Sequence, residues 1–149
     1  MGSRMEEVIK VKYHTGIDEL VYIGGSGTSN WIDLRCAEET TISAGGYVQI
    51  PLGVSIQLPP GYEAIIAPRS STYKFYGIVM ANGIGIIDES YCGDDDQWQF
   101  PAVAMRDTTV PHNARIAQFR IFKHQPNLAI QSVDHLDGQN RGGIGSTGI

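Results

Sequence analysis

The sequence predicts one all-β domain, and three observations carry that prediction. Short runs in which apolar and polar residues alternate recur along the 149-residue chain, and a period of two is typical of half-buried strands. Turn signals separate these runs about every eight to twelve residues, the spacing expected of a sandwich or barrel. Glycine is abundant, with 18 residues, and many glycines indicate many turns.

The first strand is expected at residues 8–13, where Ile9, Val11 and Tyr13 share one face and two lysines the other. The same alternation predicts further strands at residues 41–43, 47–50, 54–58, 62–67 and 115–123. Turns are expected at residues 44–46 and at the Pro-Pro-Gly of residues 59–61, because proline presets φ and glycine accepts a positive φ.

One short helix is expected at residues 72–76. Ser70 or Ser71 would be its N-cap, and Gly77 would end it. Arg69 stands just before the helix. Free N–H groups, a serine hydroxyl and an arginine together are typical of an anion site. An ordinary capped helix is the alternative interpretation.

Composition and charge limit the function classes. The formal net charge of −5 argues against non-specific binding to nucleic acid, which needs a basic face. No apolar run reaches the length of roughly 18 residues that a membrane span requires. Cys36 and Cys92 are too few for a disulfide framework and are expected as free thiols. We therefore expect a cytoplasmic protein without nucleic-acid or membrane partners, which binds anions only through local positive groups, helix N-termini or a metal.

Residues 141–148 form a glycine-rich tail with one arginine and two hydroxyl side chains. Such a segment builds no core and is mobile when free, yet its backbone amides can all face an anion. The tail is not a Walker A loop, because no lysine follows its glycines. A plain flexible C-terminus is the alternative. We assign residues 1–140 to the domain and 141–149 to a mobile arm, and we set residues 1–4 aside as a tag remnant.

A second unusual segment is residues 83–93, in which glycines alternate with aliphatic residues before a carboxylate. Glycine in a strand often marks a close approach of ligand to backbone. Asp88 follows two isoleucines and is a candidate general base, which burial and a nearby metal could tune. A carboxylate that caps a turn is the alternative interpretation.

Five segments, in this order, resemble the motifs of the trimeric dUTP diphosphatases (dUTPases), in the variant of Gram-positive bacteria and their phages. They are residues 30–34, 68–71, 82–93, 115–118 and 141–148. The resemblance implies a jelly-roll-like β-barrel that assembles as a homotrimer, with each active site built from three subunits. It implies conversion of dUTP and water to dUMP and pyrophosphate with Mg²⁺, which keeps uracil out of DNA and supplies dUMP for thymidylate synthesis.

The resemblance also implies roles for individual residues. Asp88 would orient and deprotonate the attacking water. The phosphates would be held by Arg69, Ser70, Ser71, Gln118, Arg141, Gly143, Ser146 and Thr147. Uracil and deoxyribose would be contacted by Asn82, Gly85, Ile87, Tyr91 and Ile144, with Tyr91 rejecting a 2′-hydroxyl. No protein group would ligate the metal directly; Asp33 and Gln118 would act through water.

The chain departs from the family pattern at four positions. Trp31 and Asn113 replace glycines, and Cys92 replaces an arginine. Asparagine is the residue that best tolerates a positive φ after glycine, so the turn at Asn113 is expected to survive. Ile144 replaces the phenylalanine that stacks on uracil, and Trp98 is our candidate for a substitute.

Two other functions remain open at this stage. The first is an enzyme of the same fold that resembles the dCTP deaminases, although no matching catalytic glutamate segment is present. The second is a dUTP-sensing interaction protein that binds a repressor, as a regulatory partner. The chain lacks a large insertion between the motifs that would serve that role.

Overall fold

Strands joined by short turns make up almost all regular structure in this protein. The computed structural model describes residues 6–24 and 30–143. Its elements, in order, are β1 (Lys10–Tyr13), β2 (Ile32–Arg35), β3 (Thr40–Ile42), β4 (Tyr47–Pro51), β5 (Val54–Gln57), β6 (Tyr62–Pro68), α1 (Thr72–Tyr76), β7 (Ile78–Met80), β8 (Gly85–Ile87), β9 (Gln99–Ala104), β10 (Thr108–Val110) and β11 (Arg115–Lys123). The all-β prediction with one short helix is confirmed.

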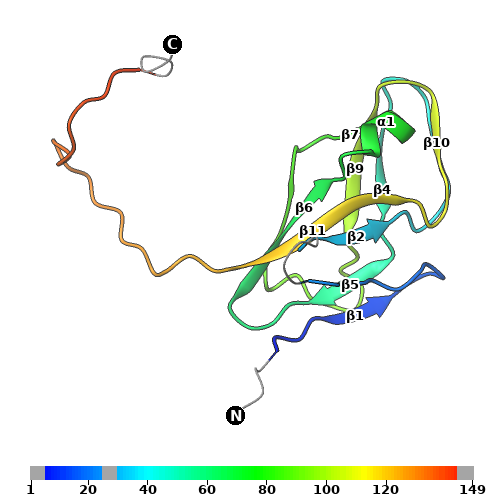
Figure 1. Ribbon diagram of the computed structural model, residues 1–149, viewed down its shortest axis with the longest axis horizontal. Helices are drawn as coiled ribbons and strands as arrows, with labels where there is room; N and C mark the ends of the chain where they lie inside the picture. The colour runs from blue at the N-terminus through cyan, green and yellow to red at the C-terminus, as the bar shows by residue number, and fades with distance from the viewer. Residues whose placement is uncertain (1–5, 25–29, 144–149) are drawn as a thin grey trace.

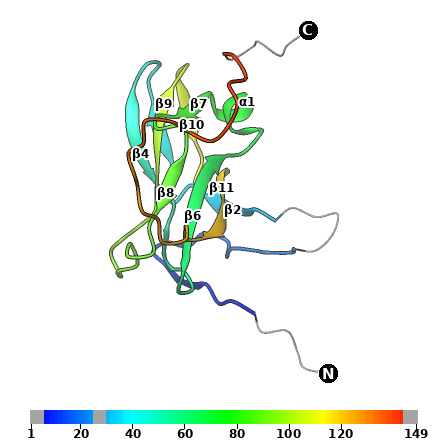
Figure 2. The same ribbon diagram turned by 90° about the vertical axis from the view of Figure 1, so that its left-hand side faces the viewer.

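The strands pair antiparallel in four sheets, which wrap around one interior as in a jelly roll (Figures 1 and 2). The largest sheet has the order β2-β11-β6-β8, and a second has the order β4-β9-β7. Strands β1 and β5 form one further pair, and β3 and β10 another. Side chains from both larger sheets meet in one core, including Ile50 and Phe100 from one and Ile66 and Phe119 from the other.

Trp98 belongs to this core. Its side chain is fully buried and packs edge-on against Phe119, with ring centroids 5.0 Å apart. A buried ring of this size stabilises the fold through its apolar area, but it cannot reach a ligand. The expectation that Trp98 stacks on uracil is therefore wrong.

The helix forms where the sequence predicts it. Gly77 ends α1 in the left-handed region, at φ 63°, and its N–H donates to the carbonyl of Tyr73. Ser71 occupies the N-cap position, but its hydroxyl makes no capping hydrogen bond. Instead, Ser71 Oγ accepts a hydrogen bond of 3.3 Å from Arg69 Nη1. The serine thus orients the arginine rather than capping the helix.

Strand β11 begins with two irregular features that shape its end of the sheet. Asn113 has φ 70°, as expected for the replacement of a glycine at this turn. Its carbonyl accepts a hydrogen bond from Arg35, and its side chain accepts one from the backbone of Asp18. The register of β11 against β2 then shifts between Arg115 and Ala117, as at a β-bulge.

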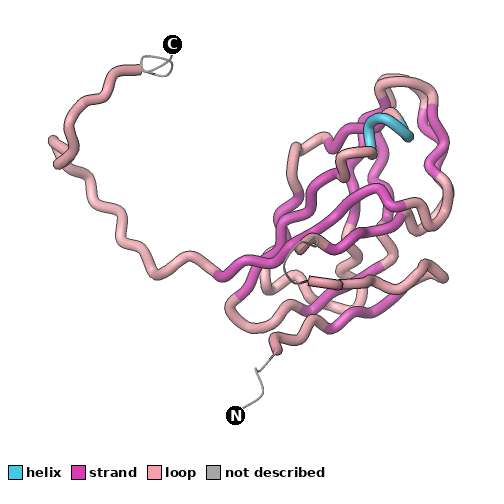
Figure 3. Tube along the Cα trace, viewed as in Figure 1, coloured by secondary structure: helices cyan, strands magenta, loops and turns pink. Residues whose placement is uncertain are grey.

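After Lys123 the chain leaves the sheets and runs as an extended segment without regular structure to residue 143 (Figures 1 and 3). Most of its side chains are exposed, including those of Ile130 and Leu136. Ile144, Ser146 and Thr147, which the sequence assigns to ligand binding, lie outside the described residues. Within the described part of the chain, no helix is long and apolar enough to cross a membrane.

Candidate active site

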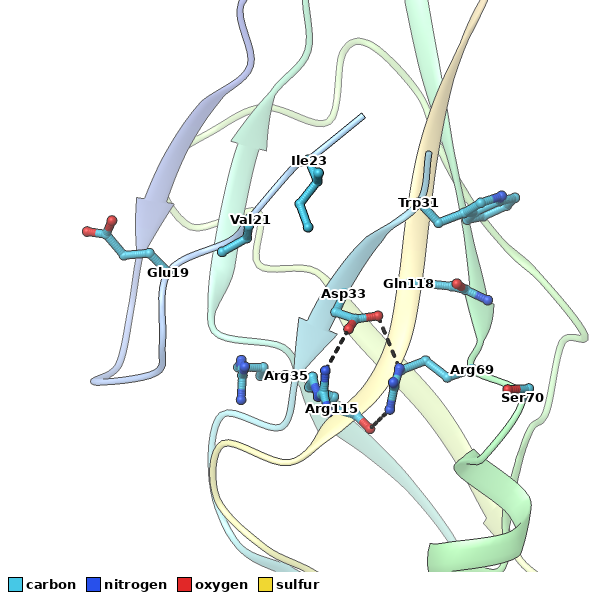
Figure 4. A pocket seen from close by; sticks show the side chains of 10 residues that line it. All are labelled: Glu19, Val21, Ile23, Trp31, Asp33, Arg35, Arg69, Ser70, Arg115 and Gln118. Atoms are coloured by element: carbon cyan, nitrogen blue, oxygen red, sulfur yellow. Dashed lines mark hydrogen bonds and ion pairs between the residues drawn. The ribbon is translucent and has the colours of Figure 1, made fainter. Parts of the chain in front are cut away.

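An arginine-lined cleft of about 470 Å³ opens beside β2, β11 and the segment that follows β6 (Figure 4). Its lining combines charged and apolar side chains: Glu19, Val21, Ile23, Trp31, Asp33, Arg35, Arg69, Ser70, Arg115 and Gln118. Four residues that the sequence singles out are brought together here, namely Asp33, Arg69, Ser70 and Gln118. They come from three of the five motif segments.

Strand register explains this convergence. Gln118 on β11 lies opposite Asp33 on β2 and, on its other side, opposite Ala67 on β6. Arg69 follows directly after the end of β6. Neighbouring strands lie about 5 Å apart, so three segments distant in the sequence present their polar side chains at one place on the sheet.

Asp33 joins two arginines at the floor of the cleft, as the dashed lines in Figure 4 show. Its Oδ1 accepts from Arg69 Nε at 3.0 Å, and its Oδ2 accepts from Arg115 Nη1 at 3.4 Å. A single carboxylate thus holds two guanidinium groups. Two positive charges against one negative charge leave the group cationic, and fixed guanidinium groups suit phosphate oxygens.

Three further hydrogen bonds fix the segment that carries Arg69. The Arg69 N–H donates to Thr72 Oγ1 at 2.9 Å, and Thr72 Oγ1 donates to the carbonyl of Ile116 at 2.8 Å. Thr72 is buried. The amide of Gln118 donates through Nε2 to the carbonyl of Pro68 at 3.0 Å. The backbone around Arg69 is therefore tied to β11 from both sides.

Sequence reasoning assigns no role to six residues that line this cleft, namely Glu19, Val21, Ile23, Trp31, Arg35 and Arg115, nor to Thr72, which supports Arg69 from outside the lining. In the sequence, Thr72 appears only as a helix residue, and Arg115 only as part of a motif without a role. Trp31 lines the cleft, although the sequence treats it only as a replaced glycine. The clearest available signal is that Trp31 lies in the same motif segment as Asp33, and Arg115 in the same segment as Gln118.

Asp88 lies just after β8, in a tight turn. One oxygen of its carboxylate accepts hydrogen bonds from Ser90 N at 2.9 Å and from Ser90 Oγ at close range. Tyr91 N donates to the Asp88 carbonyl at 3.0 Å. The hydrogen bonds from Ser90 lower the pKa of Asp88, with a smaller contribution from the charge of His124.

The environment of Asp88 differs from the one expected. The sequence suggests that burial could shift the pKa of Asp88. In the structure the Asp88 side chain is exposed, and its pKa is lowered by hydrogen bonds from Ser90. The carboxylate does cap a turn, as the alternative interpretation holds. Like an aspartate of ordinary pKa it is ionised at neutral pH and can accept a proton, but the lowered pKa makes it a weaker base.

The turn between β7 and β8, together with β8, carries three of the residues that the resemblance assigns to base and sugar, although the two strands belong to different sheets and form no hairpin. This turn contains Asn82, whose carbonyl accepts from Ile84 N at 2.8 Å. Strand β8, with Gly85 and Ile87, stands at the edge of its sheet. An edge strand presents backbone N–H and C=O groups to an incoming ligand. Tyr91 is partly exposed, and its hydroxyl donates to the carbonyl of Gln97 at 3.3 Å.

The structure does not bring Asp88 and Arg69 together within one chain. Ala64 on β6 pairs with Ile87 on β8, and continuing this register puts Asp88 beside Glu63. Arg69 follows the opposite end of β6, where α1 lies in Figure 2. The two are separated by about six residues of strand, or roughly 20 Å. One chain therefore carries the two halves of the site at opposite ends of β6.

Arg141 and Gly143, from the glycine-rich tail, are exposed near the end of the extended segment. Among the described residues, no group of three or more His, Cys, Asp or Glu side chains is arranged to hold a metal ion. Cys36 and Cys92 are free, as expected; burial raises the pKa of Cys36, while Cys92 is exposed.

Comparison with known proteins identifies relatives along nearly the whole chain. A family model described as dUTPase matches residues 26–148. The SPbeta prophage-derived deoxyuridine 5'-triphosphate nucleotidohydrolase of Bacillus subtilis (strain 168) is 49% identical over 141 residues, which cover 94% of this chain and 97% of that protein. The crystal structure of the dUTPase from Streptococcus mutans has a TM-score of 0.66 at 26% identity, covering 82% of this chain and 98% of that chain.

A second structural neighbour is a mutant dUTPase from phage phi11 of S. aureus, whose structure concerns the coordination of a structural Mg(II) ion. Its TM-score is 0.69 at 14% identity, and the match covers 88% of this chain and 99% of that chain. Identity this low shows a shared fold and no more.

Proposed function

This chain belongs to the dUTPase family, and from that membership we infer that it hydrolyses dUTP to dUMP and pyrophosphate. The observation that carries the inference best is the arginine cleft. Arg69 and Arg115, both fixed by Asp33, present guanidinium groups where the family's phosphate-binding motifs meet. Arginine forks of this kind match phosphate oxygens and stabilise negative charge that develops on a leaving pyrophosphate.

Around this pair, Ser70, Ser71 and Gln118 are the further phosphate ligands in our proposal. Ser70 and Gln118 line the same cleft as Arg69. Ser71 already contacts the Arg69 guanidinium, so it supports the orientation of that group. Hydroxyl and amide donors add hydrogen bonds to phosphate oxygens and fix the α-phosphorus for in-line attack.

Asp88 is the proposed base that orients the attacking water and accepts its proton. Its exposed, ionised carboxylate supports this role, and Ser90 fixes the direction in which it points. The roughly 20 Å that separate Asp88 from Arg69 in one chain support a homotrimer in which different subunits supply the two groups. Such sharing is common where a symmetric oligomer encloses a site at its interfaces.

The turn between β7 and β8, together with edge strand β8, is the proposed site for uracil and deoxyribose. Edge strand β8 offers backbone donors and acceptors to the base from Gly85 and Ile87, next to the turn that holds Asn82. A site that hydrogen-bonds one base rejects another by leaving a buried polar group unpaired. In this proposal Tyr91, in the turn of Asp88, packs against the deoxyribose, so that a 2′-hydroxyl would collide with its ring.

Mg²⁺ is the proposed cofactor. The ion keeps several waters and is bound through one or two carboxylates and substrate phosphates. Asp33 is already held by two arginines, which suits contact with the ion through water better than direct ligation. Gln118 turns its NH₂ group to Pro68, so its amide oxygen is the atom that can accept from such a water. When bound, the metal neutralises phosphate charge.

The tail completes the proposal. Arg141, Gly143, Ser146 and Thr147 would close over the phosphates, and Ile144 would cover the base without a π face. The extended course of residues 124–143 supports a reach to a neighbouring subunit (Figure 3). Closure of such a segment would exclude water and complete the set of donors.

The test is pyrophosphate release from dUTP with Mg²⁺, comparing the wild type with Asp88→Ala and Asp95→Ala. We expect dUMP and pyrophosphate from the wild type and a loss of about a hundredfold or more in kcat for Asp88→Ala. Asp95 is a nearby exposed aspartate, so its replacement is the matched control and should leave kcat unchanged. Full activity of Asp88→Ala would refute the assignment of the base.

The same experiment with dCTP as the substrate distinguishes a dUTPase from an enzyme of the same fold that resembles the dCTP deaminases. A dUTPase leaves dCTP intact because the uracil-reading backbone of β8 mismatches cytosine. Ammonia release from dCTP would instead identify a deaminase.

A further inference from the structure

Three segments of the chain meet at the end of the large sheet that carries Asp88. They are the turn before β6, the end of β11 and the start of the loop after β8. Gly61 lies at their centre and uses both of its backbone groups: its carbonyl accepts from His124 N at 2.9 Å, and its N–H donates to Glu89 Oε1 at 3.2 Å. The turn before β6 therefore holds both neighbouring segments.

His124 and Glu89 also contact each other. His124 Nε2 lies 3.3 Å from Glu89 Oε1 and 3.1 Å from the carbonyl oxygen of Tyr62. Both partners are acceptors, so the hydrogen must be on Nε2, whether the ring is neutral or charged. The two side chains are 41% and 37% exposed. Such a pair contributes little to global stability, yet it fixes the direction of Glu89.

Glu89 is the neighbour of Asp88 in the chain, and this links the junction to the proposed base. On one side, Ser90 and Tyr91 close the turn internally onto Asp88. On the other side, Glu89 fastens the same turn to Gly61 and His124. His124 is, in addition, the first residue beyond β11, where the extended segment starts.

We propose that His124 and Glu89 are positioning residues, which hold the Asp88 turn in place by fastening it to Gly61 and to the start of the extended segment. The proposal rests on the function proposed above for Asp88. Neither side chain touches substrate in this mechanism. Each acts through the turn, so loss of either lets the Asp88 carboxylate move relative to the bound nucleotide, and displacement of a reacting group slows the chemical step.

The experiment uses the full chain with His124→Ala, Glu89→Ala, the double variant and His135→Ala. His135 is an exposed histidine of the extended segment and serves as the matched control. We expect each single variant to lower kcat for dUTP by about three- to tenfold with KM changed by less than about twofold. The double variant should be no slower than the slower single variant, because both substitutions remove the same contact, the one between His124 and Glu89. His124→Gln keeps an N–H donor and should retain most of the activity.

Hydrogen exchange provides a readout that does not depend on the substrate. The amides of Ser90 and Tyr91 are hydrogen-bonded to Asp88 and should exchange faster in His124→Ala and Glu89→Ala than in the wild type or in His135→Ala. Unchanged exchange in both variants would overturn the proposal. So would wild-type kcat in both, or losses that multiply in the double variant. If the wild type itself leaves dUTP intact while exchange changes as expected, the proposed function fails and the positioning contact stands.

Discussion

At the scale of single residues, the charged groups Arg69, Arg115 and Asp88 of the candidate site are each held in place by a neighbouring side chain. Asp33 fixes Arg69 and Arg115 by a hydrogen-bonded ion pair, with Arg69 only 24% exposed. Ser90, in turn, fixes the carboxylate of Asp88. The pattern predicts that replacing the supporting residue changes kcat, because the group that contacts the substrate loses its orientation.

Replacement of Asp33 by alanine tests whether the orientation of Arg69 affects kcat separately from the binding of dUTP. The variant adds net positive charge to the cleft, so KM for dUTP should not rise, while kcat should fall about tenfold or more because Arg69 is no longer held. Steady-state kinetics checks both constants. Asp18→Ala is the matched control, because Asp18 pairs with Arg35 at a longer 3.6 Å and is mostly exposed. Equal losses in both variants would contradict a specific role of Asp33.

Replacement of Ser90 by alanine should move the acidic limb of the pH–rate profile. Ser90 hydrogen bonds lower the pKa of Asp88 by favouring the charged form. Loss of the hydroxyl therefore raises that pKa toward its ordinary value, and activity should begin to fall at a higher pH than in the wild type. The pH dependence of kcat/KM measures the shift. A limb that moves to lower pH or stays in place would contradict the proposed control of Asp88 by Ser90.

At the scale of elements, the segment from β6 through α1 shows how local rules position a site. Alternation predicts β6, and the glycine at residue 77 predicts the end of α1; both are observed. Strands β2, β7, β8, β9 and β10 are not among the predicted strands, and each is short or interrupted by proline, so a period of two is hard to detect. Their strand conformation comes from pairing with neighbours.

Gly77→Ala tests the end of α1. The residue has a positive φ, and a Cβ atom there would lie 2.7 Å from Arg106 Cγ. We expect the free energy of unfolding to fall by roughly 2–3 kcal/mol from backbone strain and the displaced arginine. Gly45→Ala is the matched control: φ is also positive, but nothing lies within 4 Å, so a loss of about 1 kcal/mol is expected. Urea unfolding of both variants gives the comparison. Equal losses would show that Arg106 moves aside freely.

At the scale of the whole molecule, one folded chain does not bring Asp88 and the residues of the arginine cleft together. Strand β6 holds the phosphate-binding end and the Asp88 end apart by roughly 20 Å, and the register with β8 and β11 leaves no freedom to bring them together. The extended segment after β11 points away from the sheets (Figure 1). Both features favour an assembly in which neighbouring copies complete each other's sites.

Mixed trimers provide the test. Asp88→Ala and Arg69→Ala should each be inactive alone. After the two are unfolded together and refolded in equal amounts, random assembly should restore roughly a quarter of wild-type activity, because some interfaces then combine an intact Asp88 with an intact Arg69. Each variant refolded alone is the control. Absence of recovery in mixtures that do form mixed trimers would show that one chain supplies both groups.

The sequence by itself determined the all-β class, the helix with its terminal glycine, the tolerance of Asn113 for a positive φ and the motifs that meet in the cleft. These depend on local periodicity, φ preferences and residue chemistry, which the chain carries at each position. Only the tertiary structure decided that Trp98 is a core residue, that Asp88 is exposed with a lowered pKa and that Asp33 joins two arginines. The physical reason is that burial and ion pairing depend on strand register, and register is set by contacts between segments far apart in the sequence.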